Sequence, residues 1–328
     1  MQVLLMTFIF FITSFIGNDP KLKESIPSST NIVYTSEDGG QTWKDISAGL
    51  PPDLQPNCIF DDGTEVYLGY EGGLYSSISG IKSMKWEKNI YLPSTILSFY
   101  WGKAGPYART KGKGIYQKMP VTGLWRPVYT SIKNEFVRTI LENTDGTILA
   151  GAEKGIFKSF DGGQSWKKVL AEEMITSLVA KDGVVVGGSS KGILRSDDNG
   201  DHWDYVHAKE GFAEVTGTVD GQFVAITYEE DESKQFMLKP GGLVNRVRIS
   251  QDRGKTWQNT DKMISPYEYI SDIHQSGQYY ISSNDKGIFR SSDKGKSWKQ
   301  VLPSKNKMMI SQSSSGKVMY AFKEFNGC

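Results

Sequence analysis

Five aspartates of this chain stand in copies of one eight-residue pattern, and a carboxylate in a recurring setting is the first place to look for chemistry. The pattern is Ser-x-Asp-x-Gly-x-(Thr/Ser)-Trp, with His202 replacing the hydroxyl residue in the third copy. Its aspartates and tryptophans are Asp38, Trp43, Asp161, Trp166, Asp198, Trp203, Asp252, Trp257, Asp293 and Trp298. Such carboxylates could bind calcium or act as acids and bases. Because residues that define a repeat usually serve the repeat itself, we predict a structural role.

The pattern suits a tight hairpin between two strands. An aspartate side chain accepts hydrogen bonds from the amides of a turn. Glycine adopts the positive φ that such a turn requires. The tryptophan would open the following strand and pack against the neighbouring hairpin. We call these five segments the motif hairpins.

Other residue types that support catalysis or metal binding are scarce. His202, His207 and His274 lie in separate predicted strands, without the spacing of metal ligands. The chain has two cysteines and neither a Ser/His/Asp phrase nor a glycine-rich phosphate loop. We expect neither a metal nor a cofactor, and we favour a protein without catalytic residues.

The composition is that of an all-β protein with many turns. The chain has 328 residues, of which 38% are hydrophobic and 12% aromatic, and it contains 35 glycines. It can bury a core and is not a disordered chain. Lys and Arg number 38 against 37 Asp and Glu, which gives a net charge of +1. A charge so near zero argues against binding nucleic acid.

Tryptophans divide the chain into repeats. Trp86 and Trp125 continue the series of motif tryptophans where the rest of the motif is lost, and the seven are 37 to 54 residues apart. That is about the length of one four-stranded propeller blade. Only Trp101 lies outside the series. Each unit reads as four short strands, named a to d from the inside outward. In the clearest unit they are Met174–Ala180, Val184–Gly188, Gly192–Ser196 and His202–Val206.

The two ends of the chain complement each other. Residues Asn31–Ser47 supply strands c and d only, whereas Met308–Phe322 supply strands a and b and then stop. We therefore predict a seven-bladed β-propeller of four-stranded antiparallel blades, closed by a blade that the N- and C-terminal segments share. Such closure removes an exposed sheet edge.

The motif hairpins resemble the Asp-box, or BNR repeat, of sialidases, xyloglucanases, sortilin-type receptors and photosystem II assembly factors. The resemblance covers roughly Asn31 to Phe325, and it implies hairpins on the outer rim, away from the ring axis. It is weak for function, because all these families share it. Sialidases also require an Arg-Ile-Pro string and three arginines around a carboxylate. This chain has no such string, and we expect only Arg109 and Arg138 to approach the channel, so we do not expect sialidase activity.

Function in a propeller usually resides on the face formed by the d–a and b–c connections around the central channel, here called the channel face. The residues that could bind a ligand there are Tyr70, Glu71, Tyr107, Arg109, Lys111, Arg138, Glu153, Glu229 and Glu268. Arg109, Lys111 and Lys113 form a basic stretch beside tyrosines that could hold an anionic or sugar ligand. Tyr228–Gly242 lengthens one b–c connection and is a candidate lid or partner contact. The alternative for all of them is an ordinary solvated rim.

The termini raise two further points. Residues 1–17 are apolar and read as an export signal or an N-terminal anchor, 18–30 as a linker, and 31–328 as a single propeller. An exported protein would be secreted, periplasmic or on the cell surface. Cys58 and Cys328 fall on the same face of neighbouring blades, so they could form a disulfide there. The alternative, which we slightly favour, is a buried Cys58 and a free Cys328.

The sequence thus favours an exported, non-catalytic scaffold that binds a protein or glycan partner on its channel face. We expect a monomer that touches a membrane only through an uncleaved N-terminal segment. The alternative is a glycoside hydrolase, sialidase-like or xyloglucanase-like, or a carbohydrate-binding protein. Two carboxylates facing each other across the channel would favour the hydrolase.

Overall fold

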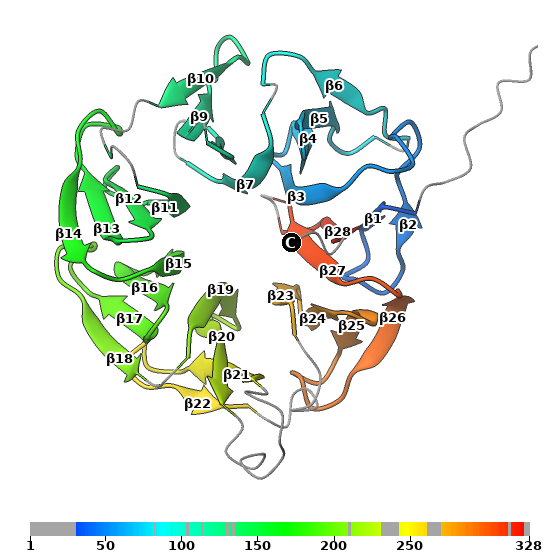
Figure 1. The fold of residues 1–328 in the computed structure, drawn as a ribbon. Helices are drawn as coiled ribbons and strands as arrows, with labels where there is room; N and C mark the ends of the chain where they lie inside the picture. The colour runs from blue at the N-terminus through cyan, green and yellow to red at the C-terminus, as the bar shows by residue number, and fades with distance from the viewer. Residues whose placement is uncertain are drawn as a thin grey trace, which may run out of the picture.

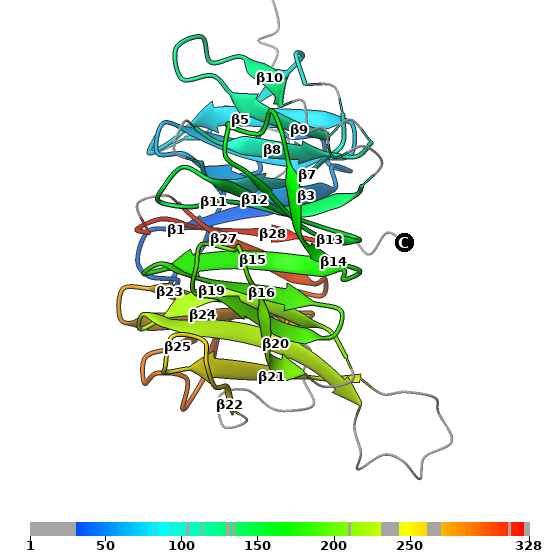
Figure 2. The same ribbon diagram turned by 90° about the vertical axis from the view of Figure 1, so that its left-hand side faces the viewer.

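The computed structural model describes residues 31–81, 83–92, 94–102, 105–112, 114–128, 132, 135–208, 211–230, 243–260, 270–313 and 316–324. In these ranges the chain forms 28 strands, which pair into seven four-stranded antiparallel sheets. The sheets are arranged around a central axis as the blades of a propeller (Figure 1). Seen from the side, the strands run from one face of the ring toward the other (Figure 2). The predicted seven-bladed fold is confirmed.

Blades 1 to 4 occupy the first half of the chain, together with its last two strands. Blade 1 contains β27 (Met308–Gln312), β28 (Met319–Lys323), β1 (Val33–Ser36) and β2 (Lys44–Asp45). Blade 2 contains β3 (Pro56–Asp61), β4 (Glu65–Tyr70), β5 (Gly73–Ile78) and β6 (Glu87–Asn89). Blade 3 contains β7 (Ile96–Tyr100), β8 (Tyr107–Thr110), β9 (Gly114–Lys118) and β10 (Trp125–Val128). Blade 4 contains β11 (Val137–Glu142), β12 (Ile148–Ala152), β13 (Gly155–Ser159) and β14 (Lys167–Ala171).

The remaining three blades follow in order. Blade 5 contains β15 (Ile175–Lys181), β16 (Val184–Ser189), β17 (Gly192–Ser196) and β18 (Asp204–Ala208). Blade 6 contains β19 (Ala213–Val219), β20 (Gln222–Glu230), β21 (Leu243–Ser250) and β22 (Gln258–Asn259). Blade 7 contains β23 (Asp272–Ser276), β24 (Tyr279–Asn284), β25 (Gly287–Ser291) and β26 (Lys299–Pro303). In the motif blades the outer strand begins just after the tryptophan rather than at it, a small correction to the expected boundary.

Blade 1 closes the ring with strands from both ends of the chain. Its strand order is β2-β1-β28-β27, and β1 pairs antiparallel with β28, with Val33 opposite Phe322 and Ser36 opposite Met319. The predicted sharing of one blade by the two terminal segments is therefore confirmed. Because each half supplies backbone groups that the other needs, neither half has a complete sheet alone.

The hydrophobic core lies between neighbouring sheets. One cluster joins Leu149 and Ile156 of blade 4 to Ile175, Val185 and Leu194 of blade 5, and all five are fully buried. Similar clusters join the other blades. Each strand b is nearly continuous in burial because it is covered on both sides.

The motif hairpins satisfy their polar groups internally. In the first, the Ser36 hydroxyl donates to Asp38 Oδ1 at 2.9 Å, and the Thr42 hydroxyl donates to Asp38 Oδ2 at 2.6 Å. In all five, the tryptophan Nε1 donates to the carbonyl of the motif glycine at 3.0–3.2 Å. The hydroxyl of Ser165 and then the neighbouring amides lower the pKa of Asp161 to about 2. These carboxylates are engaged by their own turns.

Each motif hairpin also docks on the blade before it. A Cβ added to Gly40 would lie 2.6 Å from Ile281 of blade 7, and one added to Gly200 would lie 2.7 Å from Leu149 of blade 4. Gly40 has φ of +77° and Gly200 of +89°. Glycine is required at these two places both by backbone conformation and by the close approach.

Candidate functional site

Two arginines and one phenylalanine meet on the channel face between blades 3 and 4. Arg109 precedes the last residue of β8, and Arg138 occupies a bulge in β11 between Val137 and Thr139. Their guanidinium carbons lie 5.5 Å and 5.6 Å from the centre of the Phe136 ring. The Phe136 side chain is 44% exposed. We call these three residues the Arg–Phe cluster.

Local contacts hold each arginine in place. Arg109 Nε donates to Ser98 Oγ at 2.9 Å, and Arg109 Nη1 donates to the Val137 carbonyl at 3.4 Å. Arg138 Nε and Nη2 donate to Glu153 Oε1 at 3.0 Å and 2.6 Å. The hydroxyl of Tyr100 donates to the Arg138 carbonyl, which fixes the bulge. The cluster is therefore pre-organised by neighbouring strands.

The electrostatics of the Arg–Phe cluster suit an anionic group beside an apolar one. Glu153 pairs with Arg138, and Glu135 lines the same cavity as Arg109, so the two guanidinium groups are accompanied by two carboxylates. The side chains of Arg138 and Glu153 are each 37% exposed. An ion pair so exposed contributes about 0–1 kcal/mol, so a ligand carboxylate could compete for Arg138. A cavity of about 280 Å³ beside the cluster is lined by Arg109, Ile115, Ile132, Phe136 and Val137, among others.

A second charged group lies on blades 6, 7 and 1, across the ring from β7 and β11 (Figure 1). His274 Nε2 lies 2.8 Å from Asp272 Oδ2, and Lys307 Nζ lies 2.5 Å from Glu324 Oε2. Desolvation by the nearby strands, and then the charge of Asp272, raise the pKa of Glu214 to about 7, and the residue keeps access to solvent. Burial alone would lower the pKa of His274, but the Asp272 carboxylate outweighs it and raises that pKa. We call these five residues the acidic wall.

The structure brings together Arg109, Arg138 and Glu153 from the predicted ligand residues and places others elsewhere. Tyr70 and Glu71 line a separate cavity of about 380 Å³ on blade 2, where the Tyr70 and Tyr75 rings lie 5.2 Å apart. Lys111 is exposed in the turn after β8. Glu229 lies in β20 opposite Val244. Glu268, Lys113 and residues 231–242 of the predicted lid lie outside the described residues.

Tyr107 is not a surface residue, contrary to the prediction. It is the first residue of β8, at the end opposite Thr110, and it is 4% exposed. Gln117 Nε2 donates to its hydroxyl at 3.1 Å. Burial, and then the charge of Glu142, raise its pKa to about 12. Tyr107 belongs to the core between blades 3 and 4.

Sequence reasoning missed Phe136, Glu214 and Asp272. The phenylalanine directly precedes β11 and stands two residues before Arg138, which was the available signal. Glu214 and Asp272 come from the inner strands of different blades, so nothing in their spacing marks them as neighbours.

Cys58 is a half-buried thiol of low reactivity. Burial raises its pKa to about 12, and its Sγ lies 3.9 Å from the carbonyl of Ile96. A thiolate is the reactive form of cysteine, so a raised pKa makes this thiol inert. Cys328 lies outside the described residues, and the Cys58–Cys328 disulfide stays a prediction.

The described residues contain neither of two other features. In that part of the chain, His, Cys, Asp and Glu nowhere gather in a group of three or more that could hold a metal ion. Within the same ranges, no helix has the length and apolar character needed to cross a membrane.

Comparison with known proteins identifies the fold. No family model matches the chain, and no curated protein matches it in sequence. Among solved structures, YCF48 from Cyanidioschyzon merolae has a TM-score of 0.56 at 14% identity, covering 85% of this chain and 98% of its own. The Neurospora crassa Pan2 WD40 domain has a TM-score of 0.57 at 13% identity, covering 84% and 90%.

Two further structures are similar. An ancestral GH74 enzyme has a TM-score of 0.55 at 13% identity over 84% of this chain. The match covers 48% of that enzyme, so this chain spans about half its length. A structure of YCF48 bound to a D1 peptide has a TM-score of 0.56 at 12% identity, covering 82% of this chain and 92% of its own. At these identities the similarity shows the propeller fold alone.

Proposed function

We propose that this chain is an exported, non-catalytic propeller whose channel face binds an acidic segment of a partner protein. The observation that carries the proposal is the Arg–Phe cluster, in which Arg109 and Arg138 share the exposed ring of Phe136. Guanidinium groups bind carboxylates with two parallel hydrogen bonds, and an exposed aromatic ring adds apolar contact. The proposal also takes the motif hairpins as Asp-boxes with a purely structural role.

The charge distribution around the ring supports one orientation of such a partner. The Arg–Phe cluster attracts anions, whereas the carboxylates of the acidic wall on the opposite blades repel them. An acidic segment would therefore lie over blades 3 and 4 rather than across the axis. A propeller of similar fold has been solved with a bound peptide, which is consistent with this type of partner.

A labelled peptide tests the proposal directly. The probe is a fluorescein-labelled pentapeptide of four glutamates around one phenylalanine, and binding is measured by fluorescence anisotropy at several salt concentrations. We expect Arg109→Gln and Arg138→Gln each to weaken binding about tenfold, which corresponds to about 1.4 kcal/mol. Glu153→Gln should strengthen binding, because it removes the carboxylate that competes for Arg138.

The matched control is Arg126→Gln, which removes an exposed arginine on the outer strand of blade 3. It should leave binding unchanged. Equal losses in Arg126→Gln and Arg109→Gln would reduce the effect to overall charge and contradict the proposal. Binding of neutral glycans that is independent of salt would instead favour the carbohydrate-binding alternative.

Export and domain organisation are part of the same proposal. Residues 1–17 would direct export or anchor the chain, 18–30 would link them to the propeller, and the protein would be secreted, periplasmic or on the cell surface as a monomer. Fractionation of cells that express the full chain, with N-terminal sequencing of the product, tests this. A product found in the cytosol with Met1 intact would contradict it.

Glycoside hydrolysis is the second candidate, and one observation favours it. Glu214 has a pKa raised to about 7 and lies near the carboxylate of Asp272, and many glycosidases use a pair of carboxyl groups as acid and base. Release of reducing sugar from xyloglucan, abolished by Glu214→Gln, would replace the non-catalytic proposal. We expect no turnover of xyloglucan or of a fluorogenic sialoside.

A further inference from the structure

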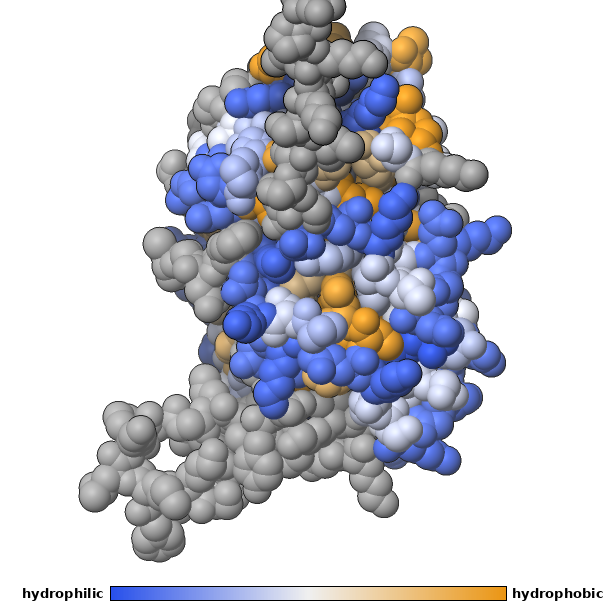
Figure 3. All heavy atoms as spheres, turned by 90° about the vertical axis from the view of Figure 1, so that its right-hand side faces the viewer, coloured by the Kyte–Doolittle hydropathy of each residue, from blue (hydrophilic) through white to orange (hydrophobic). Residues whose placement is uncertain are grey.

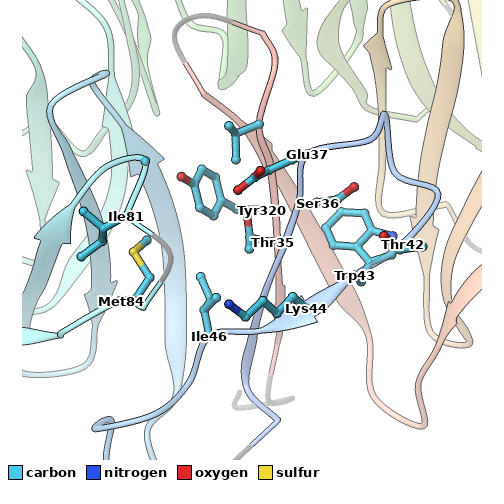
Figure 4. A pocket seen from close by; sticks show the side chains of 12 residues that line it. Thr35, Ser36, Glu37, Thr42, Trp43, Lys44, Ile46, Ile81, Met84 and Tyr320 are labelled. Carbon is cyan, nitrogen blue, oxygen red and sulfur yellow. The ribbon is translucent and has the colours of Figure 1, made fainter.

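Two cavities border blade 2, one beside its c–d hairpin and one beside its b–c turn. Figure 4 shows the first, of about 370 Å³, with Ile81 and Met84 on one side and Trp43 on the other. Tyr320 of this cavity is only 2% exposed, and its hydroxyl donates to Asp61 at 2.8 Å, so that residue belongs to the core. The second cavity, of about 380 Å³, lies on the channel face and presents side chains that the fold does not engage.

The second cavity is built from three strands of blade 2 and the loop before them. Tyr70 ends β4, Tyr75 lies in β5, and Lys88 lies in β6 directly opposite Tyr75. The loop of residues 51–55, which precedes β3, completes the lining. Leu54 anchors this loop, because its side chain is 5% exposed within the core and its amide closes a turn inside the loop. The walls of the cavity are therefore held by regular structure and by the core.

Tyr70 departs from the pattern of the other blades. In blades 3, 4, 5 and 7 the residue that ends strand b, opposite the first glycine of strand c, is small and at most 4% exposed. These residues are Thr110, Ala152, Ser189 and Asn284. The hydroxyls of Thr110 and Ser189 donate to the carbonyl of that glycine at 2.8 Å and 3.0 Å. In blade 2 this position, opposite Gly73, holds the half-buried ring of Tyr70, which the blade does not need for its turn.

Two tyrosine rings form the aromatic part of the cavity. The centres of the Tyr70 and Tyr75 rings are 5.2 Å apart, their planes are tilted by 40°, and both residues are half-buried. Burial, and then the neighbouring Tyr70, raise the pKa of Tyr75, so its hydroxyl stays neutral near pH 7. The face of a neutral aromatic ring carries partial negative charge and attracts cations, and planar guanidinium groups stack on it.

Charged side chains of both signs line the same cavity. Asp53, Glu71 and Lys88 are all exposed. Among the described residues, none of these three side chains takes part in an ion pair or a hydrogen bond. The two carboxylates outnumber the single ammonium, so the cavity favours a ligand with positive charge. Lys88, beside Tyr75, opposes such a ligand.

We propose that this cavity binds the guanidinium group of an arginine, stacked on the tyrosine pair and hydrogen-bonded to Glu71 or Asp53. A guanidinium group pairs with a carboxylate through two parallel hydrogen bonds and also stacks on aromatic rings, whereas an ammonium is a compact point charge. The volume lies near the lower end of the range of about 300–1,000 Å³ for ligand pockets. Two sources carry this chemistry, an arginine residue of a partner protein and free arginine. The site is separate from the Arg–Phe cluster, and neither proposal depends on the other.

Calorimetry on the full chain with N-acetyl-L-arginine methylamide, a blocked arginine without a carboxylate, is the test. We expect saturable binding that weakens about fivefold in Glu71→Gln and in Asp53→Asn. Tyr70→Thr should abolish binding and leave the melting temperature unchanged, because blade 3 has Thr110 at that position. The matched control is Asp285→Asn, which removes an exposed carboxylate from the equivalent turn of blade 7 and should change nothing.

Further probes identify what the cavity recognises. N-acetyl-L-lysine methylamide should bind more weakly than the blocked arginine, and Lys88→Gln should strengthen binding of the blocked arginine by removing a repulsive charge. Free L-arginine that binds more tightly than the blocked form, and that is weakened by Lys88→Gln, would assign the site to the free amino acid, whose carboxylate Lys88 then binds. Absence of saturable binding by both arginine compounds, equally tight binding of the lysine compound, or binding that ignores both Glu71→Gln and Asp53→Asn overturns the proposal.

Discussion

The five blades with motif hairpins and the two without them differ in what the tryptophan before the outer strand contacts. In the motif blades the tryptophan Nε1 donates a hydrogen bond to the glycine carbonyl of its own hairpin, so this polar group is satisfied within the hairpin. In blade 2, Trp86 Nε1 donates instead to the Ile46 carbonyl of blade 1 at 2.7 Å. In blade 3 the ring of Trp125 packs edge-on against Tyr67 of blade 2 at 5.7 Å. Both are only 8% exposed.

The surface changes with the packing. The turns of blades 2 and 3 expose Ile78 (62%), Ile81 (39%), Val121 (95%) and Leu124 (51%). Figure 3 shows hydrophobic side chains toward the top of the view, where Figure 1 places β6, and a second group near its centre. The motif hairpins carry mainly polar turn residues, although Phe160 of the blade 4 hairpin is 64% exposed. Loss of the motif in blades 2 and 3 is therefore accompanied by more apolar residues in the turns.

The largest expected effect compares two glycines of positive φ. Gly200→Ala should cost about 3 kcal/mol of unfolding free energy, since the methyl meets Leu149 at 2.7 Å and the backbone at φ +89° is strained. Gly80 in blade 2 has φ +74° and open space around it, so Gly80→Ala should cost about 1 kcal/mol. Urea denaturation measures both. Equal costs would show that docking of the motif hairpin contributes nothing.

The next comparison concerns the aspartate itself. Asp38 accepts from Ser36, Gln41 and Thr42, so Asp38→Ala should cost about 2 kcal/mol. Ser79 stands at the equivalent position of blade 2, and its hydroxyl donates to Asp61 Oδ2 at 3.0 Å. Ser79→Ala should cost about 1 kcal/mol or less. Thermal denaturation of both variants in one buffer measures the difference, and the reverse order would refute the structural role of the motif.

The architecture was predictable because it depends on local sequence patterns that recur in every blade. Seven tryptophans at blade spacing, glycine-bounded strands and the complementary ends at Val33 and Phe322 each depend on neighbouring residues or on one simple count. The strand bounds of blade 5 differ from expectation by at most two residues. Because the same strand order is expected in every repeat, an error in assigning the strands of one repeat is revealed by comparison with the others.

The candidate site was only partly predictable, because it is not repeated. Arg109 and Arg138 were recognised, but Phe136, which joins them, was not. Tyr107 was misplaced because β8 has four residues, and its two ends lie at opposite faces of the ring. Glu214 and Asp272 meet only through the curvature of the ring. Convergence of single residues from different blades leaves no signal in their spacing.

Acid should affect the motif blades through their aspartates. The hydrogen bond from the Thr256 hydroxyl is the largest of the effects that lower the pKa of Asp252 to about 2. The hydrogen bond from the Ser297 hydroxyl is likewise the largest of those that lower the pKa of Asp293 to about 2. An unfolded aspartate has a pKa of about 3.9, so this stabilisation is complete above pH 4 and is lost as the pH falls toward 2. We expect the melting temperature to fall over that range, and less steeply in Asp252→Asn, whose amide does not titrate. An unchanged slope in Asp252→Asn would contradict this assignment.

The smallest effect on stability should come from the apolar turn of blade 3. Val121 is 95% exposed, so Val121→Ser should change the unfolding free energy by less than about 0.5 kcal/mol. It should nevertheless lower the fluorescence of the hydrophobic dye ANS bound to the folded protein, because an exposed apolar side chain is removed from the patch that includes Leu124. Gln164→Ser, in the exposed turn of the blade 4 motif hairpin, is the matched control and should leave dye fluorescence unchanged. Equal dye fluorescence in the two variants would mean that the turns of motif and non-motif blades present the same kind of surface, and the contrast between the two regions would then be confined to their interiors.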